Sequence, residues 1–328
     1  MKVGELRTAL SGYDASELQE IVVTLYKMIP KSRKESDGLD GLLQSFSKEK
    51  TKPAKKEIPA DFATLKLEVE TFIQYANDDL YYVPNRIVSK DKRSKWRFEV
   101  KRFIKGLIAT HGEDSEAAAL LLTNVYNMMS YACNYWTFSS DNPFSAVGYR
   151  QTDFLQIVLS KIFYNGFSQE SIKEAVFLAL DSNVDRDTLH LELLRVLVSL
   201  LNTPDTKEMA LVQCLTYAKG YGEYQAAKKK FKYPLIDGDY RASRHKNLAV
   251  ELYLLLKISL HEYDEGIAYY WKNYKERDKE ITLYCLLTYF LSDASFNALW
   301  LREYEKAVAE GIEPRDYLQE GYKKRKGA

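Results

Sequence analysis

The sequence is poor in residues that interrupt regular structure and in residues that cross-link it. Its 328 residues include only 8 prolines, 15 glycines and 3 cysteines. Long stretches without proline or glycine favour helices over the many turns of a β protein. The cysteines, Cys133, Cys214 and Cys285, lie far apart, each within an apolar helical pattern. We therefore expect them to be reduced packing residues, and not metal ligands or disulfide partners.

An excess of charge and a membrane segment are also missing. The net charge is +1, so any binding of nucleic acid or membrane needs a local patch instead of a global field. The N-terminal stretch MKVGELRTALSG has no apolar signal-peptide core, and no stretch reaches the roughly 18 consecutive apolar residues of a membrane span. The sequence thus predicts a cytoplasmic protein that does not insert into a membrane.

Signatures of catalysis are absent as well. The chain has no glycine-rich phosphate loop, no His-Glu-x-x-His and no Cys-x-x-Cys motif. Four histidines are scattered along it: His111, His190, His245 and His261. Two groups of carboxylates could serve acid–base chemistry or bind a metal: Asp78 and Asp79, and Asp181, Asp185 and Asp187. We favour ordinary structural roles, because Asp78 and Asp79 fall where a helix is expected to end and Asp185 is the expected N-cap of the next helix. We expect no metal, no cofactor and no enzymatic activity, and an enzyme whose site is assembled from distant residues is the alternative.

The most apolar stretch, 115–138, predicts a buried central helix because it has no charged residue after Glu116. Five neutral polar residues at steps of 3, 3, 4 and 3 share one face of this helix: Asn124, Asn127, Ser130, Asn134 and Thr137. Buried polar groups must be hydrogen-bonded, so the stripe either forms an internal network or lines a groove for a peptide or small ligand. The loop 139–148 would be the rim of such a groove. We favour the internal network.

A basic segment precedes this helix. Residues 86–105 contain two acidic residues, Asp91 and Glu99, against nine basic ones. The basic residues are Arg86, Lys90, Lys92, Arg93, Lys95, Arg97, Lys101, Arg102 and Lys105. The apolar residues at steps of 4, 3 and 4 predict one buried helix edge: Trp96, Val100, Phe103 and Leu107. The charged side can bind nucleic acid or another polyanion, contact an acidic protein, or remain solvated.

The chain begins with two smaller regions. Residues 1–30 predict a helical hairpin, whose second helix starts with a capping box formed by Asp14 and Glu17. Such a hairpin is too small to hold a core alone, so it must dock or dimerise. Residues 31–60 are polar and lysine-rich, as in a flexible linker. The remaining residues, 61–328, form the predicted helical domain.

Helical signals in the second half come in pairs. Expected helix starts fall near 151, 169, 186 and 204, and again near 247, 264, 280 and 295. This spacing of 15 to 18 residues is typical of stacked helical hairpins, as in tetratricopeptide or HEAT-like arrays, although no consensus repeat is present. The stretch 220–246 between the two sets indicates an irregular boundary. The prediction is an all-α protein with an α-α superhelical architecture.

Three of those helix starts rest on particular residues. Ser168 and Asp185 are expected N-caps, and Thr203 before Pro204 places proline at the first helical position.

The opening residues, LRTALSGYDASELQEIVVTLYKMIPKSRKE, follow a Leu-x-x-x-Leu…Glu-Leu…Leu-Tyr-Lys pattern. Tyr82, Val83 and Pro84 then precede the basic segment, and a tyrosine-containing helix follows at 125–136. In these features the first ~140 residues resemble an uncharacterised bacterial helical family, a domain of unknown function. The resemblance implies an N-terminal helical hairpin and no transferable activity.

The C-terminal half is rich in aromatic residues, which either pack the helices or form a protein interface. They are Tyr263, Tyr269, Tyr270, Trp271, Tyr274, Tyr284, Tyr289, Phe290, Trp300 and Tyr304. Paired helices, abundant tyrosine and missing catalytic motifs predict a non-enzymatic helical-repeat scaffold that binds a protein or peptide partner. The alternative is binding of nucleic acid or another polyanion through residues 86–105.

Overall fold

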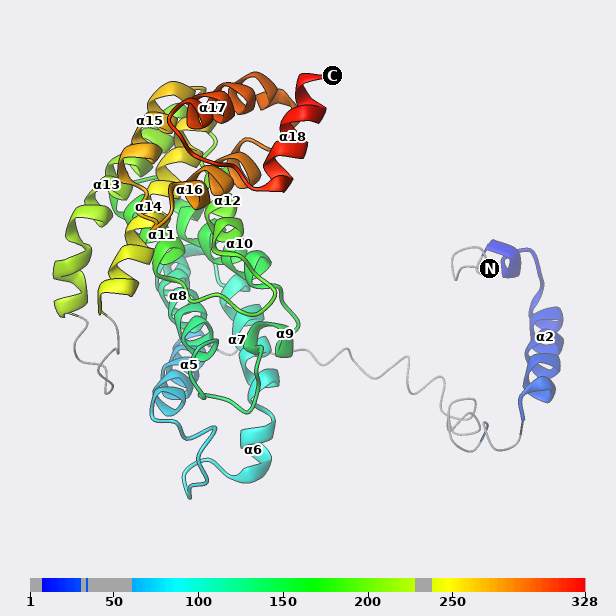
Figure 1. Ribbon diagram of the computed structural model, residues 1–328. Helices are drawn as coiled ribbons and strands as arrows, with labels where there is room; N and C mark the ends of the chain where they lie inside the picture. Colours follow the sequence, from blue (N-terminus) through cyan, green and yellow to red (C-terminus); the bar gives the residue numbers. More distant parts are fainter. Residues whose placement is uncertain (1–7, 31–33, 35–60, 228–237, 328) are drawn as a thin grey trace. The chain divides into compact units, whose positions relative to one another are not determined.

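The computed structural model describes residues 8–30, 34, 61–227 and 238–327, and only the backbone within 221–227 and 238–243 (Figure 1). The described part is helical and contains no β-strand, as predicted. None of its helices is both long and apolar enough to cross a membrane. The chain divides into two compact units, Met1–Pro59 and Ala60–Ala328.

The first unit contains α2 (Ala15–Met28). Its predicted capping box is confirmed, since the Asp14 carboxylate accepts a hydrogen bond from the Glu17 N–H at 2.9 Å and the Glu17 carboxylate accepts one from the Asp14 N–H at 2.8 Å. None of the residues of α2 is buried. Most of the expected first helix and all of the linker except Lys34 lie outside the described residues.

The second unit begins with α5 (Phe62–Asn77), α6 (Lys90–Ser94), α7 (Trp96–Ala109), η1 (Gly112–Asp114), α8 (Ser115–Ala132) and α9 (Pro143–Ala146). The predicted buried edge of α7 is confirmed, and Val100 and Leu107 are fully buried. The prediction that the central helix continues to residue 138 is wrong, because α8 ends at Ala132. Beyond it the chain turns so that Phe138 enters the core and stacks on Trp96, with ring centroids 4.0 Å apart.

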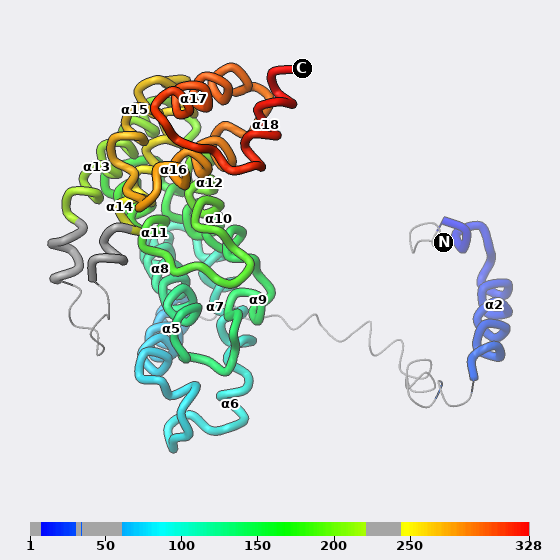
Figure 2. Tube along the Cα trace, in the orientation of Figure 1, coloured from blue at the N-terminus to red at the C-terminus, as the bar shows by residue number. Residues whose placement is uncertain are grey.

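The middle of the second unit contains α10 (Gln151–Ile162), η2 (Phe163–Asn165), α11 (Gln169–Asp181), α12 (His190–Leu200), α13 (Pro204–Ala227) and α14 (Gly238–Ser259). Helix α8 packs on α10, α10 on α12 and α12 on α14, while α11 and α14 both pack on α13 (Figure 2). The predicted start at Ser168 is confirmed by its hydrogen bond from the Ser171 N–H, and α13 starts at Pro204 as predicted. The stretch 220–246 was predicted to be irregular, but its parts that belong to α13 and α14 are helical.

The predicted N-cap at Asp185 is also wrong, because α12 begins only at His190. The Asp185 carboxylate instead accepts a hydrogen bond from the Asp187 N–H at 3.0 Å, and the Asp185 N–H donates to Gln151 at 2.8 Å. These bonds hold the residues before His190 in a loop.

The last part contains α15 (Tyr263–Asn273), α16 (Lys279–Cys285), the π-helix η3 (Leu286–Phe290), η4 (Ala294–Phe296), α17 (Asn297–Ala309) and α18 (Asp316–Lys326). Gly311 follows α17 with a φ of 85°, a left-handed conformation that glycine adopts without strain.

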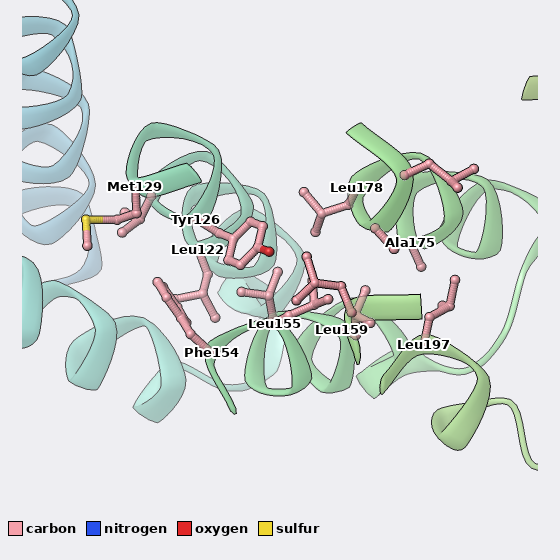
Figure 3. Packing of buried hydrophobic residues seen from close by; sticks show 14 of the residues in the cluster. Leu122, Tyr126, Met129, Phe154, Leu155, Leu159, Ala175, Leu178 and Leu197 are labelled. Carbon is pink, nitrogen blue, oxygen red and sulfur yellow. The ribbon is translucent and has the colours of Figure 1, made fainter. Parts of the chain in front are cut away.

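Two groups of buried side chains form the core of the second unit. The first contains residues of α5, α7, α8 and all the helices from α10 through α14. The second contains residues of the helices from α14 through α18. Figure 3 shows part of the first, where Tyr126 of α8 lies near Leu122 and Leu155. Helix α14 contributes Leu252 to the first group and Leu254 to the second. Helix α14 therefore connects the two halves of this unit.

Candidate partner-binding surface

The nine basic residues of 86–105 all lie at the surface of α6, α7 and the loop before them, and Arg93 and Arg102 are half-buried. Arg102 is paired with Glu68 at 2.8 Å and with Glu99 at 2.9 Å. Arg93 donates to the backbone oxygens of Val83 and Val88. The other seven form no ion pair with any residue that the structure describes. They are Arg86, Lys90, Lys92, Lys95, Arg97, Lys101 and Lys105. Most of the positive charge in this segment is therefore not neutralised by ion pairs within residues 8–30, 34, 61–227 and 238–327.

The loop between α5 and α6 is organised by the side chain of Asn85. Its amide nitrogen donates to the oxygens of Leu80 and Val83, both at 2.7 Å. Its amide oxygen accepts from the N–H groups of Ile87 at 2.9 Å and Val88 at 2.7 Å. One side chain thus satisfies four backbone groups, and Val88 is buried while Ile87 is left 63% exposed.

Large apolar side chains lie exposed among these cations. Tyr82 stacks on Trp136 from the loop after α8, with ring centroids 5.7 Å apart, although Trp136 remains 60% exposed. The guanidinium of Arg97 lies 5.0 Å from the ring centroid of Phe98, which is 58% exposed. The Tyr82–Trp136 pair is an exposed aromatic contact, a feature typical of an interaction site.

We call this set the basic–aromatic surface. Its members are Tyr82, Val83, Arg86, Ile87, Lys90, Lys92, Lys95, Arg97, Phe98 and Trp136. They belong to the loop before α6, to α6 and the residue after it, to the first turn of α7, and to the loop after α8. Figure 1 shows α6 at the end of the second unit that lies away from α17 and α18.

The predicted polar stripe is divided by the fold. Asn124, Asn127 and Asn134 are exposed, whereas Ser130 and Thr137 are buried. The Ser130 hydroxyl accepts from the Asn183 N–H at 2.8 Å, but the Thr137 hydroxyl has no hydrogen-bond partner among the described residues. Since α8 ends before Asn134, the last two members do not continue its face.

A buried polar network lies beside Ser130, and sequence reasoning missed its centre, Gln151. The Gln151 amide donates to Tyr126 at 3.2 Å and to the Asn183 oxygen at 2.7 Å, and accepts from the Asp185 N–H at 2.8 Å. Burial raises the pKa of the Tyr126 hydroxyl, which also contacts Ser182 at 3.1 Å. The network attaches the loop before α12 to α8 and α10. A polar residue on the apolar face of α10 was the available signal.

Two of the scattered histidines come close to each other through the fold. Tyr217 donates to Asp181 at 2.6 Å and lies 2.9 Å from His245, while His190 lies 3.2 Å from Arg244. Burial, with Arg244 and His245 nearby, lowers the pKa of His190 to about 3, so this ring is neutral at physiological pH. Among the described residues no group of three or more histidine, cysteine or acidic residues can hold a metal ion. The three cysteines are free.

The C-terminal aromatic residues are mainly interior. Tyr270, Phe290, Trp300 and Tyr304 are buried. Of the ten aromatic residues named from the sequence, Tyr289 is the one with an exposed side chain. They pack α15 to α18 together, so the exposed aromatic residues at the other end of the unit are the better candidates for binding.

Comparisons of the chain with protein-family models, with curated proteins and with solved structures found no match.

Proposed function

We propose that this chain is a non-enzymatic helical protein that binds a protein or peptide partner through the basic–aromatic surface. The observation that carries the proposal is the set of apolar side chains, from Tyr82 at 45% to Ile87 at 63% exposed, beside cations that form no ion pair within the described part of the chain. Tyrosine, tryptophan and arginine are the residues that most often dominate binding energy at protein interfaces. The exposed aliphatic residues Val83 and Ile87 favour a partner with apolar side chains over a polyphosphate.

The apolar surface that a partner would cover is large enough to support a specific interface. Covering the exposed part of Trp136 would remove on the order of 100 Å² of apolar surface from water, which stabilises a complex by roughly 2–3 kcal/mol. Three or four such side chains, with cations that attract an acidic partner, reach the range of micromolar binding. The expected partner therefore presents both apolar and acidic residues.

The scaffold is part of the proposal. In the series α8, α10, α12 and α14 each helix packs on the next, and this supports an array of stacked helical hairpins of the α-α superhelical kind. Such an array would hold the basic–aromatic surface rigidly. We further propose a cytoplasmic location and kinship with the uncharacterised bacterial family, which adds no activity.

The test compares the full chain with variants as bait in a lysate of the source organism, with quantitative mass spectrometry of the captured proteins. Ile87→Ser, Phe98→Ser and Trp136→Ser, combined in one chain, are expected to lose the partner. Leu120→Ser is the matched control, because Leu120 of α8 is 58% exposed but lies outside the basic–aromatic surface. A protein set that is the same for wild type and the triple variant would contradict the proposal.

Nucleic acid is the second candidate, supported by the seven cations that form no ion pair with a residue the structure describes. It predicts that affinity for a single-stranded oligonucleotide, measured by fluorescence anisotropy, falls steeply with salt. Neutralising Arg93, Lys95, Arg97 and Lys101 together is expected to abolish this binding. Binding that is independent of salt, or no binding at low salt, would exclude this candidate.

A further inference from the structure

Helix α2 of the first unit carries a row of apolar side chains that is open to solvent. Leu18, Ile21, Leu25 and Met28 follow one another at steps of 3, 4 and 3. This is the spacing of the a and d positions of a heptad repeat, through which one helix packs against another. Met28 is 75% exposed and Leu25 is 56% exposed, while Leu18 and Ile21 are half-buried. We call these four residues the α2 seam.

The rest of the helix is distributed as a paired helix requires. Val22 lies next to the α2 seam and is 48% exposed, so it widens the apolar face. Glu20 and Lys27 lie on the opposite face, because helical residues advance by about 100° each. None of the four seam positions holds a polar residue. The apolar face is therefore continuous along the whole of α2.

This helix needs a second surface in order to be stable. It has 14 residues, and isolated helices shorter than about 12–15 residues are marginal in water. Its capping box at Asp14 satisfies N–H groups of the first turn but covers no apolar side chain. None of the residues of α2 is buried. The free energy that would hold the helix together must therefore come from covering the α2 seam.

The charges of α2 favour a second copy of the same helix as the cover. Asp14, Glu17 and Glu20 lie in or before its N-terminal half, whereas Lys27 lies in its last turn and Lys34 follows the helix. In an antiparallel pair, the acidic half of each copy lies beside the basic end of the other, and the two helix dipoles oppose each other favourably. A parallel pair would place like charges together. The helix is thus complementary to itself about a two-fold axis.

We propose that α2 is a dimerisation helix, which pairs through the α2 seam with α2 of a second copy of this chain in antiparallel orientation. In such a pair, each a position faces a d position of the other copy. Leu18 of one copy therefore faces Met28 of the other, at both ends of the interface. The dimer joins two copies of the second unit in one assembly. The proposal is independent of partner binding by the basic–aromatic surface, which belongs to the second unit.

The strength of the dimer follows from the area that it covers. Pairing would remove on the order of 300 Å² of apolar surface per copy from water, given the exposed fractions of the α2 seam and Val22. A standard interface covers about 800 Å² per partner. The interface of α2 is smaller, so we expect a dimer that dissociates in the micromolar range of concentration.

The first test is sedimentation equilibrium of the full chain at concentrations that span the micromolar range. The wild type is expected to show a concentration-dependent equilibrium between monomer and dimer. Leu25→Ser is expected to raise the dissociation constant about a hundredfold, because both copies lose an apolar side chain from the interface. Val23→Ser is the matched control, because Val23 is 46% exposed on the same helix but lies outside the α2 seam. It is expected to leave the equilibrium unchanged.

The second test reports the orientation of the two helices. A chain carrying Leu18→Cys is mixed with a chain carrying Met28→Cys, the mixture is oxidised, and the cross-linked peptides are identified by mass spectrometry after trypsin digestion. The peptide masses distinguish these cross-links from any that involve Cys133, Cys214 or Cys285. Disulfides between position 18 of one chain and position 28 of the other are expected to predominate.

Three results would each overturn the proposal. The first is a full chain that remains monomeric throughout the micromolar range, which would mean that another protein or another part of the chain covers the α2 seam. The second is an equal effect of Leu25→Ser and Val23→Ser on the dissociation constant. The third is a predominance of disulfides that join position 18 to position 18 and position 28 to position 28, as a parallel pair would form.

Discussion

Replacing Gln151 by leucine tests whether the buried polar network determines stability. Gln151 is fully buried, and its amide makes three hydrogen bonds, two of them to backbone groups of the loop before α12. Leucine has a similar volume and no polar atoms. The substitution therefore removes the hydrogen bonds while leaving little cavity.

The expected loss of stability follows from the hydrogen bonds that each partner of Gln151 keeps after the substitution. The Asp185 N–H loses the one acceptor it has among the described residues, and the Asn183 oxygen keeps only the Ser130 hydroxyl at 3.3 Å. Tyr126 keeps its contact with Ser182 at 3.1 Å. One orphaned and one weakened buried group, at about 1–3 kcal/mol each, predict a loss of about 2–4 kcal/mol in the free energy of unfolding.

The assay is urea unfolding of the full chain, monitored by circular dichroism and analysed by linear extrapolation. Tyr126→Phe is the graded comparison: it removes one hydroxyl and leaves two of the Gln151 bonds, so a loss of about 1 kcal/mol is expected. Gln74→Leu on the exposed side of α5 is the control and should change stability by less than about 0.5 kcal/mol. If Gln151→Leu costs no more than Tyr126→Phe, the reasoning is refuted.

Two further predictions concern burial and close packing. Burial raises the pKa of Glu251 to about 7, although Tyr274 donates a hydrogen bond to its carboxylate, so the folded state binds this proton more tightly than the unfolded state. This contribution to stability is fully present below the ordinary pKa of 4.5 and is lost as pH rises through about 7. Glu251→Gln should remove up to about 3 kcal/mol of that pH dependence, and unfolding curves at low and high pH that show the same dependence as the wild type would contradict this. A Cβ at Gly266 would lie 2.8 Å from the Cβ of Lys257, so Gly266→Ala should cost about 1–3 kcal/mol, whereas Gly321→Ala should gain up to about 1 kcal/mol. If the thermal unfolding midpoints move in the same direction for both substitutions, the Cβ contacts at Gly266 and Gly321 do not determine the change in stability.

Local signals in the sequence predicted local structure well. The capping box of Asp14 and Glu17, the N-cap Ser168 and the start of α13 at Pro204 all depend on residues within one helical turn. The buried edge of α7 follows in the same way from helical periodicity. Each of these features is determined by neighbours in the chain, so one sequence suffices to predict it.

The incorrect predictions concern helix boundaries that depend on contacts between residues far apart in the chain. Helix α8 stops early because Phe138 reaches Trp96 on α7, and α12 starts late because Asp185 is bound by Gln151 on α10. For the candidate site, the sequence indicated the basic residues. It did not indicate that Trp136 would join Tyr82 at the surface, since these residues are far apart in the chain.

By itself, the sequence determined the all-helical class, most of the helices and the exposure of the basic segment, because helical periodicity and turn residues act over short distances. Only the tertiary structure decided which polar residues are satisfied inside and which aromatic residues remain exposed. It also placed Gly321 against the ring of Trp300, where an added Cβ would lie 3.5 Å from Cζ2. The physical reason is that a side chain is buried only where a second surface covers it, and the sequence of one helix does not identify the helix that packs against it.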